Sequence, residues 1–156
     1  MTLSNANAVT LTRTDSTNAA FVELVSLLDR DLAERDGADN SFYAQFNKVA
    51  AIRYVIVASL EDKPIACGAI KAFSDESMEV KRMFTLPDYR GKRIASLVLD
   101  ALENWAKELG YRSCVLETGK RQPEAIALYR SKGYEIIPNY GQYIRVKNSI
   151  CFLKRL

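Results

Sequence analysis

The sequence predicts an α+β domain, that is, a mixed sheet flanked by helices, and three observations favour this class. Residues 54–60 and 65–73 are rich in β-branched and aromatic side chains around a short polar turn, which indicates an antiparallel hairpin. Residues 79–95 pass from strand character, through Pro87, into a long amphipathic helix. The apolar run 113–117 follows that helix, an order typical of two parallel strands joined by a crossover helix.

A short strand and a helix are expected before the hairpin. Over residues 8–13, Val9, Leu11 and Arg13 alternate with Thr10 and Thr12, which predicts the strand. Thr17 or Asn18 can cap a helix that runs to about Glu34. The apolar face of this helix consists of Phe21, Leu24, Val25, Leu27 and Leu28. Residues 41–49 predict a further short helix.

The two later helices have clear ends. Gly110 is expected to end the long helix, and Pro123 and Gly133 bracket the second one. The apolar face of the long helix repeats at helical spacing through Ile94, Leu97, Val98, Ala101, Leu102, Trp105 and Leu109. Residues 134–137 and 149–153 then predict a final pair of strands joined by a long loop.

The turn before the long helix has the features of an anion-binding loop. The first backbone N–H groups of a helix have no intrahelical partner, and the peptide dipoles place partial positive charge at the same end. Gly91 lets the backbone approach a ligand closely, while Arg90, Lys92 and Arg93 add full positive charges around it. A diphosphate is a natural ligand for such a turn.

Two segments resemble the signatures of one family. Residues 90–95, RGKRIA, resemble the Arg/Gln-x-x-Gly-x-Gly/Ala pyrophosphate loop of the GNAT superfamily, the acyl-CoA-dependent N-acetyltransferases. Residues 125–134, AIALYRSKGY, resemble the later helix of that family, in which Leu-Tyr is followed by three residues, Gly and an aromatic residue. The sequence departs from the family at Arg93, where a glycine is usual.

The resemblance implies a three-layer fold with a mixed, mostly antiparallel sheet of about six or seven strands and about four helices. In that fold the sheet is splayed between its fourth and fifth strands, here residues 79–85 and 113–117. The pantetheine arm of the cofactor enters the gap like an extra strand. Met83, Phe84 and Thr85 are expected to pair with the arm through their backbone, because unpaired strand groups are ready partners for amides.

The implied co-substrate is acetyl-CoA. By resemblance, its diphosphate is expected at the turn and the first turn of the long helix, and its sulfur near the tyrosine of the second signature. The cofactor-binding residues expected on this basis are Met83, Phe84, Thr85, Arg90, Gly91, Lys92, Arg93, Ile94, Ala95, Ser96 and Tyr129.

The length, composition and charge of the chain limit the classes of protein to which it can belong. With 156 residues, 48% of them hydrophobic and 26% charged, the chain suits one globular domain, expected over residues 1–156. A net charge of +3 is too small to argue for a nucleic-acid-binding protein. Because the sequence shows neither an apolar run of about 18 residues nor a signal-peptide pattern, we expect no membrane association and a cytoplasmic location.

The absence of histidine and the placement of the cysteines argue against several kinds of catalytic and metal site. The sequence contains no histidine, which excludes Ser-His-Asp and Cys-His nucleophilic sites and any metal site built on imidazole. Cys67, Cys114 and Cys151 are far apart in apolar surroundings, so we expect small buried side chains rather than disulfides or zinc ligands. No metal is expected.

Acid–base work must then fall to carboxylates, tyrosine, lysine or water. Tyr129 matches the family's motif tyrosine, so the resemblance implies that it protonates the leaving thiolate; packing within the helix is the other reading. Glu79 opens the central strand and Glu117 closes its proposed neighbour, so either carboxylate can face the split and act as the base. Lys81 and Arg82 are candidate ion-pair partners for them.

The function expected from the resemblance is acetyl transfer from acetyl-CoA to a primary amine of a small molecule or peptide, by direct attack in a ternary complex. Residues 14–47 carry seven acidic side chains against two arginines, a net charge of −5, which favours a cationic acceptor. In this family the first helices and the late loop, here 139–143, commonly form the acceptor side.

Two alternatives stay open at the level of sequence. One is a catalytically silent acyl-CoA-binding module of the same fold. The other is a small basic nucleic-acid-binding protein, which the sparse aromatic residues near the cationic turn disfavour, so no nucleic-acid partner is expected. A monomer and a homodimer are equally compatible with the sequence.

Overall fold

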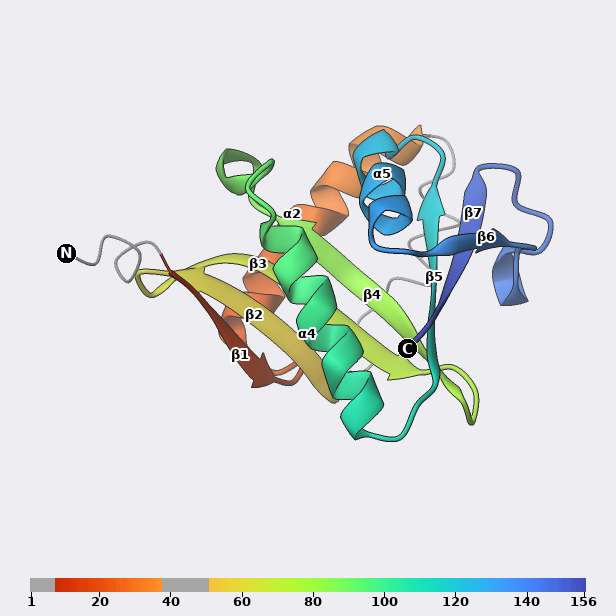
Figure 1. The fold of residues 1–156 in the computed structure, drawn as a ribbon. Helices are drawn as coiled ribbons and strands as arrows, with labels where there is room; N and C mark the ends of the chain where they lie inside the picture. The colour runs from red at the N-terminus through yellow and green to blue at the C-terminus, as the bar shows by residue number, and fades with distance from the viewer. Residues whose placement is uncertain (1–7, 38–50) are drawn as a thin grey trace.

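The computed structural model describes residues 8–37 and 51–156 and contains one seven-stranded sheet with helices on both faces (Figure 1). The strands are β1 (Val9–Thr14), β2 (Tyr54–Leu60), β3 (Lys63–Ala72), β4 (Ser77–Thr85), β5 (Ser113–Gly119), β6 (Glu135–Ile137) and β7 (Ser149–Arg155). The α-helices are α2 (Ala19–Asp36), α4 (Ile94–Glu108) and α5 (Pro123–Ser131), with 3-10 turns at Pro87–Tyr89 and Gly141–Tyr143. The helix expected over residues 41–49 lies outside the described residues.

The strand order is β1-β2-β3-β4-β5-β7-β6, and the pairing of β4 with β5 is parallel whereas the other pairings are antiparallel. This confirms the predicted mixed, mostly antiparallel α+β architecture. Since α4 connects β4 to β5, the predicted strand–helix–strand unit is also confirmed. The final strands β6 and β7 pair with each other as expected, and β7 lies between β5 and β6.

The local sequence signals account for several ends of these elements. Asn18 caps α2, because its side-chain oxygen accepts from the backbone N–H of Phe21 at 3.0 Å. The β2–β3 turn consists of two residues, Glu61 and Asp62, both at positive φ (49° and 67°), as a tight turn matching strand twist requires. The predicted four-residue turn was therefore too long, and Lys63 belongs to β3.

The two faces of the sheet bury separate apolar clusters. In Figure 1, α4 lies in front of the central strands and α2 lies behind them. The cluster on the α4 side includes Ile56, Ile70, Met78, Val98, Leu99, Leu102 and Phe152. The cluster on the α2 side includes Phe21, Leu24, Val25, Val55, Val57, Ala69 and Phe84. The predicted stripe of α2 is confirmed, whereas that of α4 is confirmed only in part, because Leu97 and Leu109 are exposed and Leu99 and Ala106 are buried in their place. The sheet separates the two layers.

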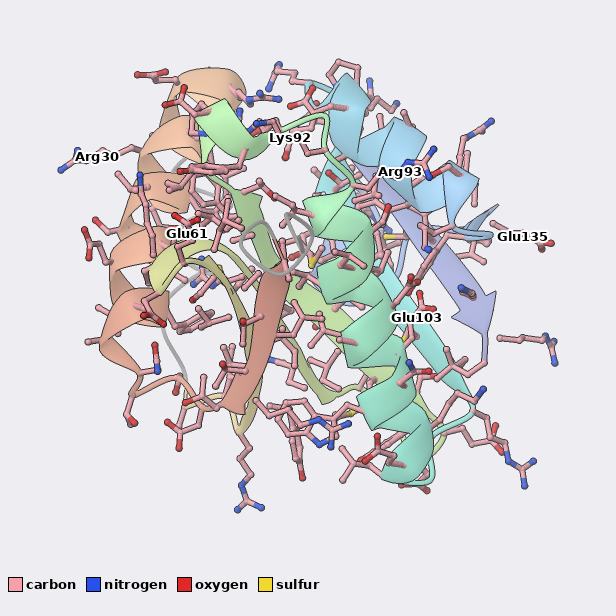
Figure 2. All side chains as sticks on the ribbon, turned by 60° about the vertical axis from the view of Figure 1, so that its left-hand side comes forward. Arg30, Glu61, Lys92, Arg93, Glu103 and Glu135 are labelled. Atoms are coloured by element: carbon pink, nitrogen blue, oxygen red, sulfur yellow. The ribbon has the colours of Figure 1, made fainter. Side chains whose placement is uncertain are left out.

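A buried polar network ties α4 to the C-terminal strands. Glu103 accepts from the Tyr134 hydroxyl at 2.9 Å and from the Lys154 ammonium at 2.7 Å. Figure 2 shows Glu103 on the side of α4 that faces these strands. Because both carboxylate oxygens are satisfied, a charged side chain that is only 6% exposed can be accommodated inside the α4 layer.

A β-bulge distorts β4 halfway along its length. Cys67 lies opposite Phe84 and Ala69 lies opposite Lys81, so the single residue Gly68 faces both Arg82 and the residue after it. Arg82 has a φ of 60°, which adds a local twist to the strand. The extra residue places the side chains of Lys81 and Arg82 on the same α2 face, where strict alternation would separate them.

The sheet opens between β4 and β5. The parallel pairing consists of Ser77 with Ser113, Met78 with Cys114 and Glu79 with Val115. Beyond these pairs β4 continues to Thr85 along β3, while β5 continues along β7 to Gly119. The inner edges of the two strands therefore diverge and carry backbone groups that are not paired across the gap. The predicted split between the fourth and fifth strands is confirmed.

Gly68 is expected to tolerate no side chain, because its position opposite the bulge is filled. A Cβ at this residue would lie 2.5 Å from the Met83 sulfur and 2.9 Å from both Leu102 Cδ1 and Val98 Cγ1. We expect Gly68→Ala to lower the free energy of unfolding by about 1–3 kcal/mol, measured by urea denaturation. Lys71→Ala, at an exposed position of the same strand, is the control, and equal stability of the two variants would contradict this packing.

Candidate active site

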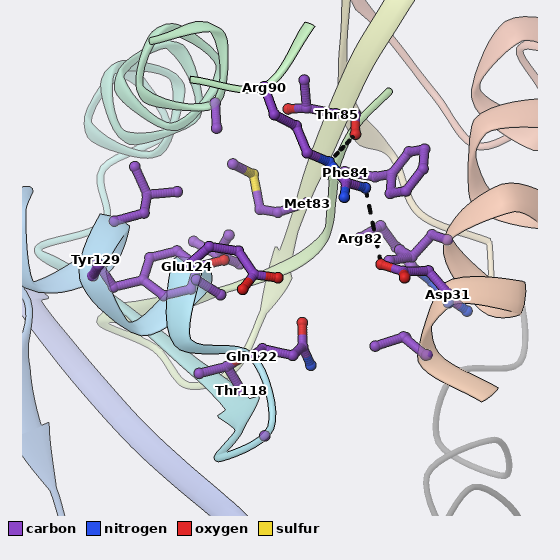
Figure 3. Close-up of a pocket in the computed structure, with 18 of the residues that line it drawn as sticks. Asp31, Arg82, Met83, Phe84, Thr85, Arg90, Thr118, Gln122, Glu124 and Tyr129 are labelled. Atoms are coloured by element: carbon purple, nitrogen blue, oxygen red, sulfur yellow. Dashed lines mark hydrogen bonds and ion pairs between the residues drawn. The ribbon is translucent and has the colours of Figure 1, made fainter. Parts of the chain in front are cut away.

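The split in the sheet opens into a cavity of about 500 Å³ (Figure 3). Its walls are the diverging parts of β4 and β5, the turn before α4, the first turn of α4, one face of α5 and the C-terminal half of α2. Of the residues expected from the sequence to bind cofactor or do chemistry, those that line the cavity are Glu79, Met83, Phe84, Thr85, Arg90, Gly91, Arg93, Ile94, Ala95, Ser96, Glu117 and Tyr129. Lys92 is not among the lining residues.

The turn before α4 adopts the backbone shape that the anion-loop prediction needs. Gly91 has a φ of 76°, and Arg93, the N-cap of α4, has a φ of 64°. Arg93 thus takes the left-handed conformation that a glycine adopts without cost, although it carries a side chain. In Figure 2, Arg93 lies beside the start of α4 on the side of α5.

The backbone of this turn presents amides to the cavity. The N–H of Leu97 bonds to the Arg93 carbonyl at 3.1 Å, which is the first bond of the helix. The N–H groups of Ile94, Ala95 and Ser96 precede it, so the helix itself offers them no acceptor. The side chain of Arg93 makes no capping hydrogen bond. The helix N-terminus is consequently a site where an anion can meet several amides and the positive end of the dipole.

The side chain of Arg90 extends toward the end of β4 and α2, away from the backbone amides at the start of α4. Its Nε donates to the Thr85 carbonyl at 2.9 Å, its guanidinium stands 5.5 Å from the Phe84 ring centroid, and Nη2 lies 3.9 Å from an Asp31 oxygen (Figure 3). Arg90 thereby joins the end of β4 to α2.

Lys92 does not line the cavity; its ammonium lies 5.7 Å from the ring centroid of Tyr89, and the ammonium of Lys63 lies 5.3 Å from the same ring. The sequence grouped Lys92 with Arg90 and Arg93 because the three are close neighbours along the backbone. The fold separates their directions.

The two candidate carboxylates lie on the α2 face of the split. Glu79 accepts from the Tyr140 hydroxyl at 2.7 Å and lies 3.9 Å from the Lys81 ammonium. Lys81 is therefore an ion-pair partner of Glu79, as predicted, and burial lowers the pKa of this lysine. Arg82, the other candidate partner, instead reaches α2 and pairs with Asp29 at 3.1 Å.

Glu117 has a different environment. The hydroxyl of Ser149 donates to its Oε2 at 2.6 Å. Burial raises the pKa of Glu117 to about 7, and the negative charges of Asp36 and Glu79 add to the rise, whereas the Ser149 hydroxyl and the Lys81 ammonium oppose it. The Glu117 carboxylate can therefore accept a proton near neutral pH, which suits a general base.

Tyr129 enters the cavity from α5 on the opposite side (Figure 3). Its ring packs at 5.7 Å from the Tyr134 ring and 6.0 Å from the Phe152 ring, measured between centroids. Burial and the nearby charge of Glu117 raise the pKa of Tyr129, so the phenol keeps its proton at neutral pH. A protonated phenol can act as a donor, and the expected packing role and the donor role are compatible.

The split brings these groups together from two sides of the sheet. Tyr129 packs in the α4-side cluster, whereas Glu79, Lys81 and Glu117 face the α2 side. An intact sheet would separate the two layers. Because β4 and β5 diverge, one cavity is lined by a proton donor and by carboxylates.

Two acidic residues of α2, Asp31 in the cavity wall and Asp29 outside it, have cationic partners. Asp29 pairs with Arg82, and Asp31 pairs with Arg35 at 3.3 Å as well as with Arg90. Arg35 also forms an ion pair with Glu124 of α5. These pairs offset much of the negative charge that the sequence placed beside the acceptor, so a preference for cationic acceptors stays a prediction.

Comparisons with known proteins identify the family of this chain. Residues 20–134 match the Acetyltransferase (GNAT) family. The chain belongs to this family. A protein called IAA acetyltransferase, from Azospirillum brasilense, is 34% identical to this GNAT chain. The match covers 86% of this chain and 90% of that protein.

Solved structures share the fold of this GNAT domain. A Klebsiella pneumoniae protein proposed to be an acyl-CoA N-acyltransferase superposes with a TM-score of 0.80 at 28% identity, covering 96% of this chain and 98% of that one. A GNAT family acetyltransferase from Elizabethkingia anophelis, solved with acetyl-CoA bound, superposes with a TM-score of 0.69 at 17% identity. The superposition covers 95% of this chain and 98% of that one.

Several residues of the site were not identified from the sequence. Ser149, Tyr140 and Tyr143 contact or line the site from the segment that follows β6, where the sequence supported only the general expectation that residues 139–143 face the acceptor. Asp36 and Gln122 also line the cavity. No spacing rule could have found them, since the Ser149–Glu117 bond joins residues 32 positions apart and the Tyr140–Glu79 bond joins residues 61 apart.

The described residues contain no reactive cysteine pair, metal-ligand cluster or membrane-spanning helix that would indicate a different kind of site. Cys67, Cys114 and Cys151 are buried and free, and burial raises the pKa of each thiol. Within residues 8–37 and 51–156, no group of three or more metal-ligating side chains is close enough to hold an ion. No helix in this same part is both long enough and apolar enough to span a bilayer.

The environment of Glu117 predicts a pH dependence of stability. The native state holds its proton up to a pKa of about 7, above the ordinary value of 4.5, so the unfolded state binds fewer protons between these values. The contribution of Glu117 to stability is therefore largest below about pH 4.5 and is lost as the pH rises to about 7. We expect Glu117→Gln to flatten this slope in denaturant titrations from pH 5 to pH 8; an identical slope in both proteins would contradict a buried carboxyl.

Proposed function

We propose that residues 1–156 form one N-acetyltransferase domain that moves an acetyl group from acetyl-CoA to a primary amine by direct attack in a ternary complex. The observation that carries the proposal is the split between β4 and β5, which opens into a cavity with helix amides at one end and carboxylates at the other. Membership of the GNAT family supports the reaction class.

The residues of the cavity fit the chemistry of a nucleotide thioester. A diphosphate suits the amides of Ile94, Ala95 and Ser96 at the positive end of α4. An arm bearing amides suits the inner edge of β4 from Met83 to Thr85, because this stretch is not paired with β5; the Thr85 carbonyl already accepts from Arg90. Acetyl-CoA supplies the acyl group in activated form, as a thioester.

The protein's own groups divide the proton transfers between them. Glu117 is the proposed base that takes the proton from the attacking amine, since its carboxyl titrates near neutral pH. Tyr129 is the proposed acid that donates to the leaving sulfur, since it keeps its proton at neutral pH. Glu79, held by Tyr140 and Lys81, is the proposed carboxylate that orients the incoming amine.

The acceptor is proposed only as an amine of a small molecule or peptide. The acidic segment suggests a cationic acceptor, and this is the acceptor we propose. Because Asp29 and Asp31 of that segment already form ion pairs, the charge of the preferred acceptor must be measured. Because one relative is named for IAA, the test panel combines cationic, neutral and acidic amines with IAA. Release of free thiol from acetyl-CoA measures turnover for each.

Binding of the diphosphate at α4 can be tested with two matched carboxylates. Ser96→Asp and Leu97→Asp each add one negative charge to the first turn of α4, but Ser96 lines the cavity whereas Leu97 is 43% exposed and does not. We expect Ser96→Asp to weaken acetyl-CoA binding at least tenfold in calorimetry, by repulsion, and Leu97→Asp to weaken it much less. An acid at this end does not destabilise the helix. Equal affinities would contradict the diphosphate assignment.

The acid and base assignments predict distinct kinetic effects. For the wild type, kcat/KM should rise with pH through about 7, because only the charged Glu117 accepts a proton. Glu117→Gln should remove this limb and lower kcat about 100-fold, and Tyr129→Phe should lower kcat about tenfold or more without weakening acetyl-CoA binding. Unchanged rates would remove either residue from the mechanism. Cofactor binding by the wild type without amine-dependent thiol release would favour the catalytically silent acyl-CoA-binding module.

A further inference from the structure

The segment between β6 and β7 contacts both candidate carboxylates. We define residues 138–148 as the β6–β7 loop. Tyr140 of this loop donates its hydroxyl to Glu79 Oε2 at 2.7 Å. Ser149, where the loop enters β7, donates its hydroxyl to Glu117 Oε2 at 2.6 Å. One connection therefore holds a carboxylate of β4 and a carboxylate of β5, on the two sides of the split.

Asn139 organises this loop from within. Its Nδ2 lies 3.1 Å from the Tyr143 carbonyl, 3.2 Å from the Val146 carbonyl and 3.1 Å from the Ser149 carbonyl. The loop's own turns add bonds from the Tyr143 N–H to the Tyr140 carbonyl at 2.9 Å and from the Ser149 N–H to the Val146 carbonyl at 3.1 Å. A side chain shared among three carbonyls fixes the loop as one unit, so Tyr140 and Ser149 keep their positions together.

The titratable and charged groups around Glu117 come from every element packed against it. They are Glu79 and Lys81 from β4, Asp36 from α2, Tyr129 from α5, Tyr143 from the loop and Cys151 from β7. Lys81 and the neutral Ser149 hydroxyl favour the charged carboxylate, whereas burial and the acidic neighbours disfavour it.

We propose that Asn139 is a positioning residue for acetyl transfer, which holds the hydroxyls of Tyr140 and Ser149 against Glu79 and Glu117 and thereby fixes the position of both carboxylates. This inference rests on the proposed function of the site. Asn139 touches neither carboxylate and acts through the loop. The assignment gives the loop between the last two strands a role in proton transfer as well as in facing the acceptor.

The proposal predicts a change in the titration of Glu117 itself. Ser149→Ala removes the hydroxyl that favours the charged form, and Asn139→Ala releases the segment that places that hydroxyl. In ¹³C NMR titrations of the glutamate carboxyls, with Glu117→Gln to assign the signal, both variants should raise the Glu117 midpoint by about one pH unit. Ser149→Thr, which keeps the hydroxyl, should restore the wild-type midpoint.

The same shift has a kinetic signature that a merely structural role would not give. An upward shift of about one unit from a midpoint near 7 lowers kcat/KM about fivefold at pH 7 but less than about twofold at pH 9. Affinity for acetyl-CoA should not change, since Asn139 and Ser149 do not line the cavity. Tyr140→Phe should raise KM for the amine and leave the Glu117 midpoint in place.

Ile144→Ala is the matched control, because Ile144 belongs to the same loop, is 64% exposed and bonds neither carboxylate. A Glu117 midpoint that Ser149→Ala leaves unchanged, or an equal loss of activity at all pH values, would overturn the proposal. A midpoint that Asn139→Ala leaves unchanged would overturn it equally, and if Asn139→Ala does not fold, Asn139→Gln, which moves the amide away from the three carbonyls on a longer side chain, takes its place. The NMR titration does not depend on turnover, so a wild type that titrates as described but releases no thiol would refute the proposed function and not the loop's effect on Glu117.

Discussion

The site depends on the parallel pairing of β4 with β5 ending after Glu79 and Val115. Each strand stays paired along its other edge, β4 with β3 and β5 with β7, so both halves of the sheet keep their ladder hydrogen bonds where they diverge. Inner-edge N–H and C=O groups must then find water or a ligand, because unpaired polar groups away from water are costly. A cavity bordered by such edges is suited to a ligand that carries amides of its own.

The divergence also decides which side chains can meet. A continuous sheet would keep Tyr129, packed on the α4 side, apart from Glu79 and Glu117 on the α2 side. The bulge at Arg82 contributes by turning consecutive side chains toward α2, so that Arg82 anchors Asp29 while Lys81 remains beside Glu79. Chemistry between the layers is therefore a property of the split and not of either layer alone.

The two glutamates of the site, Glu79 and Glu117, have different surroundings. Glu79 has a hydroxyl and an ammonium as partners, whereas Glu117 is desolvated, lies near two other carboxylates and has one close hydroxyl donor. Environments that differ in this way are what distinguish an orienting carboxylate from a base. Both environments rely on the β6–β7 loop, whose shape rests largely on the hydrogen bonds of Asn139.

The sequence by itself determined features that act over one or two turns: a cap of α2 at Thr17 or Asn18, most of the apolar stripe of α4, the ends of α5 at Pro123 and Gly133, and the turn at Gly91 that exposes helix amides. These depend on spacing and on backbone preference, which are local. Only the tertiary structure decided that Ser149 meets Glu117, that Tyr140 meets Glu79 and that Arg90 crosses to Asp31. Those contacts follow from strand order and from the point where β4 and β5 part, and no local signal encodes either.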